Sequence, residues 1–267
     1  MFILIPPSEG KNSSSDNEYF SLDSLSYDFL NKKRSQIIDY LRDNNLSKDI
    51  YLKTIGISNH NYEKISTMNS KIETSQVVSS ISRYTGVLYD YLDYPSLDAK
   101  AKSLLDESLI IFSGLFGLLR TQDKIPNYKL KIATKLIGGI KLSKFWKDEI
   151  TKVLKNVLEN QIVLNFLPVE FNNAFDSKVI DYKYELTFSF KQENNNGELK
   201  SITHWSKALR GSLIRYLLNN VTDFNSIDEV ISISKLFTNN SDYEYSEKLS
   251  KFNKSKCEIM YINKHDK

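Results

Sequence analysis

The sequence predicts a mixed α/β fold of the α+β type, in which a mixed sheet flanked by helices forms a single compact unit. Three observations predict it: short apolar runs typical of buried strands, other segments with apolar residues at helical spacing, and glycine or proline between the two kinds. The chain has no internal repeat and no clear linker. We therefore expect one domain over residues 1–267, with two lobes as the alternative and 223–267 as a C-terminal segment with the weakest pattern.

The predicted strands are short apolar or alternating runs that end at glycine, proline or polar clusters. They cover residues 2–5, 108–112, 129–133, 161–166, 179–190, 199–203 and 258–262. Pro6 and Pro7 end the first strand, since proline has no N–H to donate to a neighbouring strand. The alternation in 179–190 is typical of a strand with one wetter face.

The predicted helices carry apolar residues three or four positions apart. They cover residues 22–41, 48–55, 62–69, 75–82, 96–105, 143–159, 204–219 and 227–231. Ser143 is expected to cap its helix, with Trp146, Ile150 and Leu154 on the core face.

The amino-acid composition argues against a membrane protein and against a metal-binding protein. Apolar residues make up 40% and charged residues 26% of the chain, which is ordinary for a globular protein, and the net charge is only +3. No apolar stretch approaches the ~20 residues that cross a bilayer, so we expect no membrane partner and a cytoplasmic location. The single cysteine, Cys257, fits a reducing compartment. Three scattered histidines give no zinc-ligand spacing, so we predict no metal and no other cofactor.

The stretch Ile111–Arg120 is the first candidate site. A buried strand runs into Ser113-Gly114, where glycine lets a ligand approach the main chain, and Arg120 offers a fork suited to phosphate or carboxylate. The alternative is a tight hairpin whose arginine is solvated.

The turn Ser8-Glu9-Gly10-Lys11 is the second candidate site. It follows the first strand, and ligands of open sheets favour the carboxyl ends of strands. Ser8 would donate a hydrogen bond, Glu9 would act as base or charge partner, and Lys11 would bind an anion. Tyr128 and Asn165, next to a proline or at a strand end, are candidate pocket walls. A capped turn without function is the alternative.

Basic residues gather in two segments. Eight lie between Arg120 and Lys147 against one acid, and Lys207, Arg210 and Arg215 belong to an acid-free stretch. Lys207 and Arg210, three apart on a helix, share a face that could contact phosphate. The alternative is that these side chains coat solvated helices.

Several motifs in order resemble the landmarks of the bacterial YaaA family. They are Ile-Leu-Ile-Pro-Pro-Ser-Glu-Gly-Lys (3–11), Arg-Tyr-Thr-Gly-Val-Leu-Tyr (83–89), Ser-Gly-Leu-Phe-Gly-Leu-Leu-Arg (113–120), Ile-Pro-Asn-Tyr-Lys-Leu (125–130), Phe-Trp (145–146), Val-Leu-Asn-Phe (163–166) and Lys-Ala-Leu-Arg-Gly (207–211). The resemblance implies a cytoplasmic peroxide-stress protein that binds DNA, protects it and limits free iron. It also implies a basic cleft and a helix-hairpin-helix-like element.

Two functions follow. The first is a DNA-binding stress protein whose cleft, lined by Arg120, Lys129, Lys131, Lys207, Arg210 and Arg215, contacts phosphates without reading bases. The second is an enzyme or binder of a nucleotide-like small molecule, in a pocket formed by the Ser8–Lys11 turn, the Ser113–Arg120 turn and Lys207 with Arg210. We favour the first. Direct iron sequestration is a third and weaker hypothesis, because only carboxylates would be left as ligands.

Overall fold

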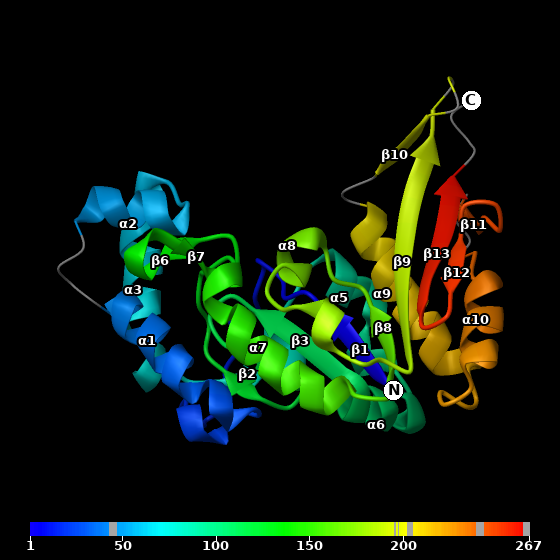
Figure 1. Cartoon of the computed structure of the whole chain (residues 1–267). Helices are drawn as coiled ribbons and strands as arrows, with labels where there is room; N and C mark the ends of the chain where they lie inside the picture. The colour runs from blue at the N-terminus through cyan, green and yellow to red at the C-terminus, as the bar shows by residue number, and fades with distance from the viewer. Residues whose placement is uncertain (43–46, 195, 197, 202–204, 239–242, 264–267) are drawn as a thin grey trace.

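A mixed sheet runs through the middle of the computed structural model, which describes residues 1–42, 47–194, 196, 198–201, 205–238 and 243–263 (Figure 1). Parallel neighbours form its centre in the order β13-β9-β8-β1-β3. Their bounds are β1 (Phe2–Ile5), β3 (Leu109–Ser113), β8 (Ile162–Asn165), β9 (Tyr184–Glu193) and β13 (Lys256–Asn263). Antiparallel strands complete the sheet: β4 (Gly117–Leu119), β10 (Leu199–Ser201), β11 (Tyr243–Tyr245) and β12 (Lys251–Asn253). The mixed α/β prediction is therefore confirmed.

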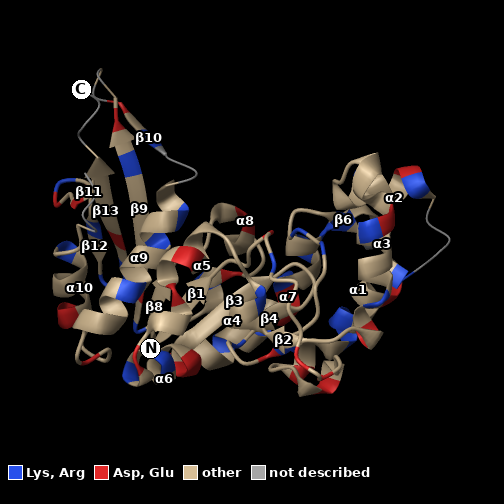
Figure 2. Cartoon of the chain, turned by 180° about the vertical axis from the view of Figure 1, so that it is seen from behind, with Lys and Arg blue, Asp and Glu red and all other residues tan. Residues whose placement is uncertain are grey.

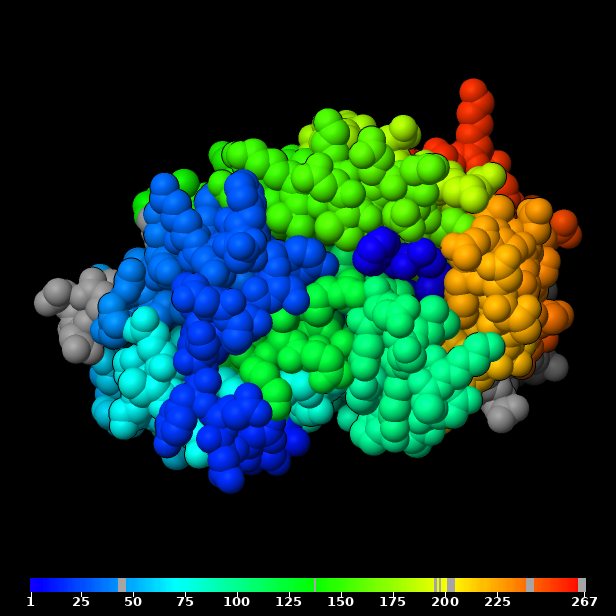
Figure 3. Space-filling model, turned by 90° about the horizontal axis from the view of Figure 1, so that it is seen from below, coloured from blue at the N-terminus to red at the C-terminus, as the bar shows by residue number. Residues whose placement is uncertain are grey.

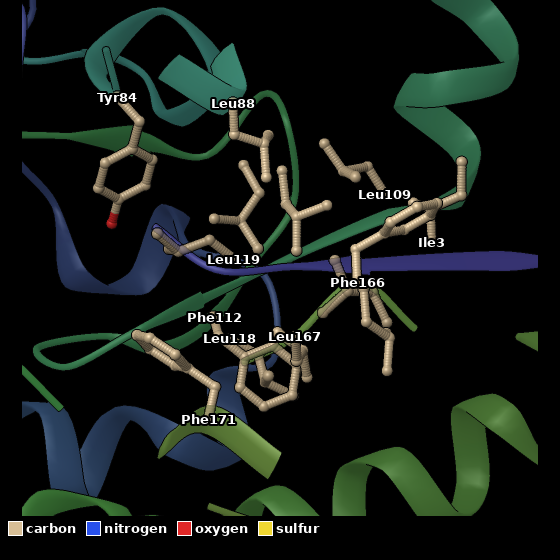
Figure 4. Packing of buried hydrophobic residues seen from close by; sticks show 14 of the residues in the cluster. Ile3, Tyr84, Leu88, Leu109, Phe112, Leu118, Leu119, Phe166, Leu167 and Phe171 are labelled. Atoms are coloured by element: carbon tan, nitrogen blue, oxygen red, sulfur yellow. The ribbon is translucent and has the colours of Figure 1, made fainter. Parts of the chain in front are cut away.

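Both faces of the sheet are buried at the central strands β3 and β8, which is why β3 is apolar at nearly every position. Figure 4 shows Leu88 and Leu119 on one side of β1 and β3, and Phe112 and Phe171 on the other. The rings of Phe112 and Phe171 meet edge to face, with centroids 6.3 Å apart. The C-terminal strand β13 pairs with β9 along its whole length, so it belongs to the same sheet.

Helices cover the sheet and build a lobe beside it. Their bounds are α1 (Asn31–Arg42), α2 (Lys48–Ile55), α3 (Tyr62–Ser70), α4 (Ser80–Arg83), α5 (Val87–Leu92), α6 (Ala99–Ser108), α7 (Leu142–Leu158), α8 (Val169–Asn172), α9 (Trp205–Asn220) and α10 (Ile227–Lys235). Figure 3 shows the segment with α1, α2 and α3 (blue to cyan) bulging from one side of the body. Two small sheets, β2 (Val78–Ser79) with β5 (Lys124–Ile125) and β6 (Lys135–Leu136) with β7 (Ile140–Lys141), connect the parts. None of the described helices is long and apolar enough to cross a membrane.

Several predicted elements differ from the structure. The segment 22–41 is not one helix, because Tyr27 takes a left-handed conformation (φ 60°) and only α1 is α-helical. The segment 75–82 contains β2 and the start of α4 instead of one helix. Residues 129–133 are not a strand and lie in an irregular segment.

Three further boundaries shift. The predicted strand 179–190 begins only at Tyr184 and is paired on both sides by β8 and β13. Ser143 lies inside α7, whose N-cap is Lys141, although Trp146, Ile150 and Leu154 form its buried face as predicted. His204, the predicted first residue of the basic helix, lies outside the described residues, and α9 begins at Trp205.

Candidate functional site

The turn Ser8–Lys11 leaves the carboxyl end of β1 and lies against the segment Arg83–Gly86. Lys11 and Tyr84 form an isolated antiparallel bridge, and backbone hydrogen bonds flank it. A side chain added to Gly86 would meet Oγ of Ser8 at 2.8 Å, so the turn and the segment touch. The structure thus brings together two motifs that are more than 70 residues apart in the sequence.

Arg83 holds this arrangement together, although it was not predicted as a site residue. Its side chain is buried, and its guanidinium donates to the carbonyls of Asn12, Ser14 (2.9 Å) and Ile125 (3.2 Å). A buried arginine that satisfies three main-chain acceptors holds separate segments in one register.

Tyr84, Tyr128 and Ser113 form a buried hydrogen-bonded chain beneath the turn. The hydroxyl oxygens of Tyr84 and Tyr128 are 2.7 Å apart, and Tyr128 lies 2.8 Å from Oγ of Ser113. Ser113 also accepts the N–H of Phe116 at 3.0 Å. Burial raises the pKa of Tyr128 to about 12, although its hydrogen bonds with Ser113 and Tyr84 oppose the change. Ser113 is fully buried, so it positions Tyr128 and does not face a ligand.

The amine of Lys11 lies over this aromatic floor. Its Nζ is 4.2 Å from the ring centre of Tyr128 and 5.5 Å from that of Tyr84, and it donates to the carbonyl of Ser8 at 3.2 Å. Burial is the main reason why the pKa of Lys11 falls from 10.5 to about 7. The positive charges of Lys129 and Arg83 lower it further, and Glu9 only partly offsets them.

Glu9 is occupied by two other lysines. Its carboxylate oxygens lie 2.9 Å from Nζ of Lys129 and 2.9 Å from Nζ of Lys131. Partial burial works to raise the pKa of Glu9, but hydrogen bonds and charge from the two lysines outweigh it and lower the pKa to about 2. Glu9 is therefore ionised at neutral pH and unsuited to act as a base.

The segment that carries Lys129 and Lys131 is held in place by Asn69 and Gly114. Asn69, which is fully buried on α3, accepts the N–H of Lys129 at 2.9 Å and donates to its carbonyl at 3.0 Å. A Cβ on Gly114 would lie 3.0 Å from the backbone of Lys131 and of Ile132. Only glycine leaves room for this approach.

A cavity of about 300 Å³ opens above Lys11, between this segment and α3. Its lining combines lysines, amides and apolar side chains around one acid. The lining residues are Glu9, Lys11, Ile57, Asn61, Lys64, Ile65, Met68, Asn127, Tyr128 and Lys129. Three of these lining residues, Asn61, Lys64 and Asn127, were not predicted from the sequence. No local sequence pattern indicates that the helix α3 packs near a turn that is distant in sequence.

Arg120 does not belong to this cavity. The hairpin of β3 and β4 pairs Ser113 with Gly117, so the chain returns to the opposite end of the sheet before it reaches Arg120. There its guanidinium lies 5.8 Å from the ring of Phe2, at the start of β1, and donates to the carbonyls of Asp106 (3.0 Å) and Glu107. The tight hairpin is found, but its arginine binds the end of α6 and is not merely solvated.

Asn165 is the last residue of β8, at the same edge of the sheet as Ser8, and its side-chain amide is hydrogen-bonded within the protein. It donates to Glu185 (3.0 Å) and Asn172 (3.1 Å) and accepts the N–H of Leu167 (3.0 Å). It does not line the cavity.

Arg215 is also hydrogen-bonded within the protein. It donates to the carbonyls of Leu92 (3.1 Å) and Asp93 (3.0 Å) at the end of α5. A Cβ on Gly211 would lie only 2.2 Å from the carbonyl oxygen of Leu88, so α9 packs directly on the backbone of α5.

Lys207 and Arg210 lie on the first turns of α9, outside the residues that line the cavity. Lys207 is exposed, whereas Arg210 is half-buried and its Nε has no hydrogen-bond partner in the described part of the chain. Figure 2 shows basic and acidic residues spread over both the sheet body and the helical lobe. Of the six predicted cleft residues, Lys129 and Lys131 face Glu9, whereas Arg120 and Arg215 donate to main-chain carbonyls.

No group of three or more His, Cys, Asp or Glu residues in the described ranges could hold a metal ion. The polar groups that line the candidate site are amines, amides, the hydroxyl of Tyr128 and the carboxylate of Glu9.

Comparison with known proteins gives one consistent relationship. A family model described as peroxide stress protein YaaA matches residues 1–249. A protein of Corynebacterium glutamicum from the family UPF0246 is 32% identical over 242 residues, 88% of this chain and 92% of its own length. A UPF0246 protein of Francisella philomiragia is 33% identical over 212 residues, 78% of this chain and 76% of its own length. An uncharacterised protein of Campylobacter jejuni is 31% identical over 222 residues, 82% of this chain and 85% of its own length. Together with the paired Ser8–Lys11 and Arg83–Gly86 motifs, these matches show that the chain belongs to the peroxide stress protein YaaA family.

Proposed function

We propose that the protein serves the peroxide-stress response by binding a phosphate-bearing, nucleotide-like small molecule in the cavity above Lys11. The observation that carries this proposal is the half-buried amine of Lys11, which lies over the Tyr128 ring in a cavity also lined by Lys64 and Lys129. Small-molecule sites are concave, mostly apolar and supplied with a few converging polar groups, and this cavity has that composition.

The lining offers a separate contact for each part of a nucleotide. Ile57, Ile65 and Met68 give an apolar surface for a flat ring, and the amides of Asn61 and Asn127 can pair with its edge. Lys64 and Lys129 lie where a phosphate would enter, and a phosphate can compete with Glu9 for Lys129.

The pKa of Lys11 makes the affinity for an anion depend on pH. Lys11 carries its charge below about pH 7 and loses it above, so we expect affinity for a phosphate to fall as the pH rises through 7. The bound anion should raise the pKa of Lys11, and binding near pH 7 should therefore take up protons.

Calorimetric titration with adenosine 5′-monophosphate tests the proposal. At pH 6.5 the Lys11→Met variant should bind at least about 10-fold more weakly than the wild type, since a charge-assisted contact is worth about 1.5–3 kcal/mol. Lys155→Met removes an exposed lysine of α7 and serves as the control. Equal affinities of wild type and Lys11→Met would contradict the proposal.

DNA is the second candidate ligand, and two lysines favour it: Lys64, which lines the cavity, and Lys131, which pairs with Glu9 of the lining. Lys131 is 46% exposed in its side chain, Lys64 is exposed, and both could contact phosphates along a strand without reading bases. Protection of DNA, which the family resemblance implies, would then follow from covering the strand.

The salt dependence of the affinity for single-stranded and duplex DNA distinguishes binding at the cavity from binding at α9. If the strand lies at the cavity mouth, the double variant Lys64→Ala/Lys131→Ala should reduce the slope of log affinity against log salt by about 1–2. The double variant Lys207→Ala/Arg210→Ala should then leave the slope unchanged. The opposite result would place DNA on α9, and no salt-dependent binding would remove DNA as a ligand.

A further inference from the structure

The surroundings of Lys11 differ from those of an ordinary anion-binding lysine. Among the described residues, the hydrogen-bond acceptor of its Nζ is the carbonyl of Ser8, at 3.2 Å, and no carboxylate forms an ion pair with it. The nearest acid, Glu9, has each of its oxygens 2.9 Å from another lysine. Two cations, Lys129 and Arg83, act against the ammonium form.

The same amine faces open space. Its Nζ lies over the rings of Tyr84 and Tyr128, and Lys11 lines the cavity of about 300 Å³. An amine that is held by aromatic rings, lacks a carboxylate partner and opens into a cavity has the geometry of a lysine that attacks carbonyl carbons.

We propose that Lys11 is a nucleophilic amine that condenses reversibly with the carbonyl carbon of a phosphate-bearing aldehyde in this cavity. The inference rests on the proposed function, because Lys64 and Lys129 would hold the phosphate of the same ligand. The aldehyde belongs either to a free sugar phosphate or to the ring-opened sugar of a base-free nucleotide in DNA.

The step balances without an oxidant or reductant. The lone pair of Nζ forms a bond to the carbonyl carbon, and the carbonyl oxygen takes a proton to give a carbinolamine. That oxygen then leaves as water with a second proton, and the nitrogen–carbon double bond of the imine forms. The amine and the aldehyde thus give imine and water, and hydrolysis reverses the reaction.

Reductive trapping on the native chain tests the inference directly. The protein is incubated at pH 7 with glyceraldehyde 3-phosphate and cyanoborohydride, which reduces an imine to a stable secondary amine, and the modified lysines are mapped by peptide mass spectrometry. Because about half of the Lys11 amine is unprotonated at pH 7, its labelling should exceed that of Lys155 by on the order of 10- to 100-fold. Labelling of Lys11 at the level of Lys155 would overturn the inference.

A competition experiment distinguishes a failure of the Lys11 nucleophile from a failure of the phosphate site. Glycerol 3-phosphate has no carbonyl group and should compete with the labelling of Lys11 but not of Lys155. If glycerol 3-phosphate binds by calorimetry and Lys11 is still not labelled, the nucleophile is refuted and the phosphate site stands. If neither result appears, the proposed function fails as well.

A single-stranded oligonucleotide with one base-free site distinguishes the source of the aldehyde. Borohydride should join it covalently to the wild-type protein and not to Lys11→Arg, which keeps the charge and lacks the nucleophile. A cross-link with the free sugar phosphate alone assigns the small molecule, and one with the oligonucleotide assigns DNA. A cross-link that Lys11→Arg still forms would contradict the role of Lys11.

Discussion

The side chain of Lys11 destabilises the folded protein at the pH at which we propose that it functions. Its pKa is about 7 in the folded protein against 10.5 for a free lysine, so the unfolded chain binds more protons between these two values. Stability therefore rises as the pH increases from 7 toward 10.5, and the full cost of the buried ammonium is present below pH 7. A residue that destabilises the fold at working pH is expected at a functional site.

Replacing Lys11 by methionine should accordingly stabilise the protein in acid. We expect Lys11→Met to raise the free energy of unfolding at pH 6 by on the order of 2 kcal/mol, since a pKa displaced by one unit corresponds to about 1.4 kcal/mol and water in the cavity screens part of the effect. The gain should shrink at pH 10. Urea unfolding at both pH values measures it, with Lys155→Met as control. A gain of the same size at both pH values would show that the charge is not responsible.

For Ser113, which belongs to the hydrogen-bonded hydroxyl chain under Lys11, we predict the opposite effect on stability. Ser113→Ala removes the partner of the Tyr128 hydroxyl and of the Phe116 N–H in a fully buried place. We expect a loss of about 1–3 kcal/mol in the free energy of unfolding, because buried polar groups left without partners are costly. The control, Ser103→Ala, removes an exposed hydroxyl and should change stability by less than about 0.5 kcal/mol. Equal stability of the two variants would refute the role of the chain.

At the scale of elements, the cavity depends on how closely the irregular segment 129–133 approaches the hairpin of β3 and β4. Gly114 permits this approach, and Asn69 clamps the segment from α3. The segment belongs to no strand, so contacts with distant residues, these two among them, set its position. The lysines that rim the cavity are therefore placed by residues far from them in sequence.

A methyl group at Gly114 should disturb the cavity more than the overall fold. Gly114→Ala would bring Cβ within 3.0–3.1 Å of the backbone of residues 130–132, which has to move. We expect weaker binding of adenosine 5′-monophosphate together with a loss of about 1–3 kcal/mol in stability. Gly138→Ala is the matched control, because its Cβ meets no atom within 4 Å while its φ of +66° still carries the left-handed strain. Unchanged binding in Gly114→Ala would show that the segment does not position the site.

At the scale of the whole molecule, the sequence is informative where local pattern decides the structure. The strand before Ser113 and the turn at Gly114 follow from an apolar run ended by glycine, and both are confirmed. The carboxyl ends of neighbouring parallel strands then bring Ser8 and Ser113 to one edge, as the strand-end argument predicted.

The remainder of the site depends on long-range contacts that leave no local signal. Arg120 was expected beside Ser113, but the antiparallel return of β4 carries it to the other end of the sheet. Arg83 and Asn69 bind partners 40 or more residues away, and Lys64 lines the cavity with the equally distant Lys11, but no local pattern predicts this. Residues 129–133 were predicted to be a strand, yet tertiary contacts hold them without one.

Survival of peroxide by a bacterium that lacks its own member of this family tests the central claim, that the cavity above Lys11 is the working site. The strain would express the wild type, Lys11→Met, Lys207→Met or Lys155→Met, with equal soluble amounts verified by immunoblot. The account predicts that Lys11→Met fails to restore survival although it is at least as stable as the wild type, while the other two variants restore it. Full rescue by Lys11→Met would contradict the account, and failure of Lys207→Met alone would move the working surface to α9.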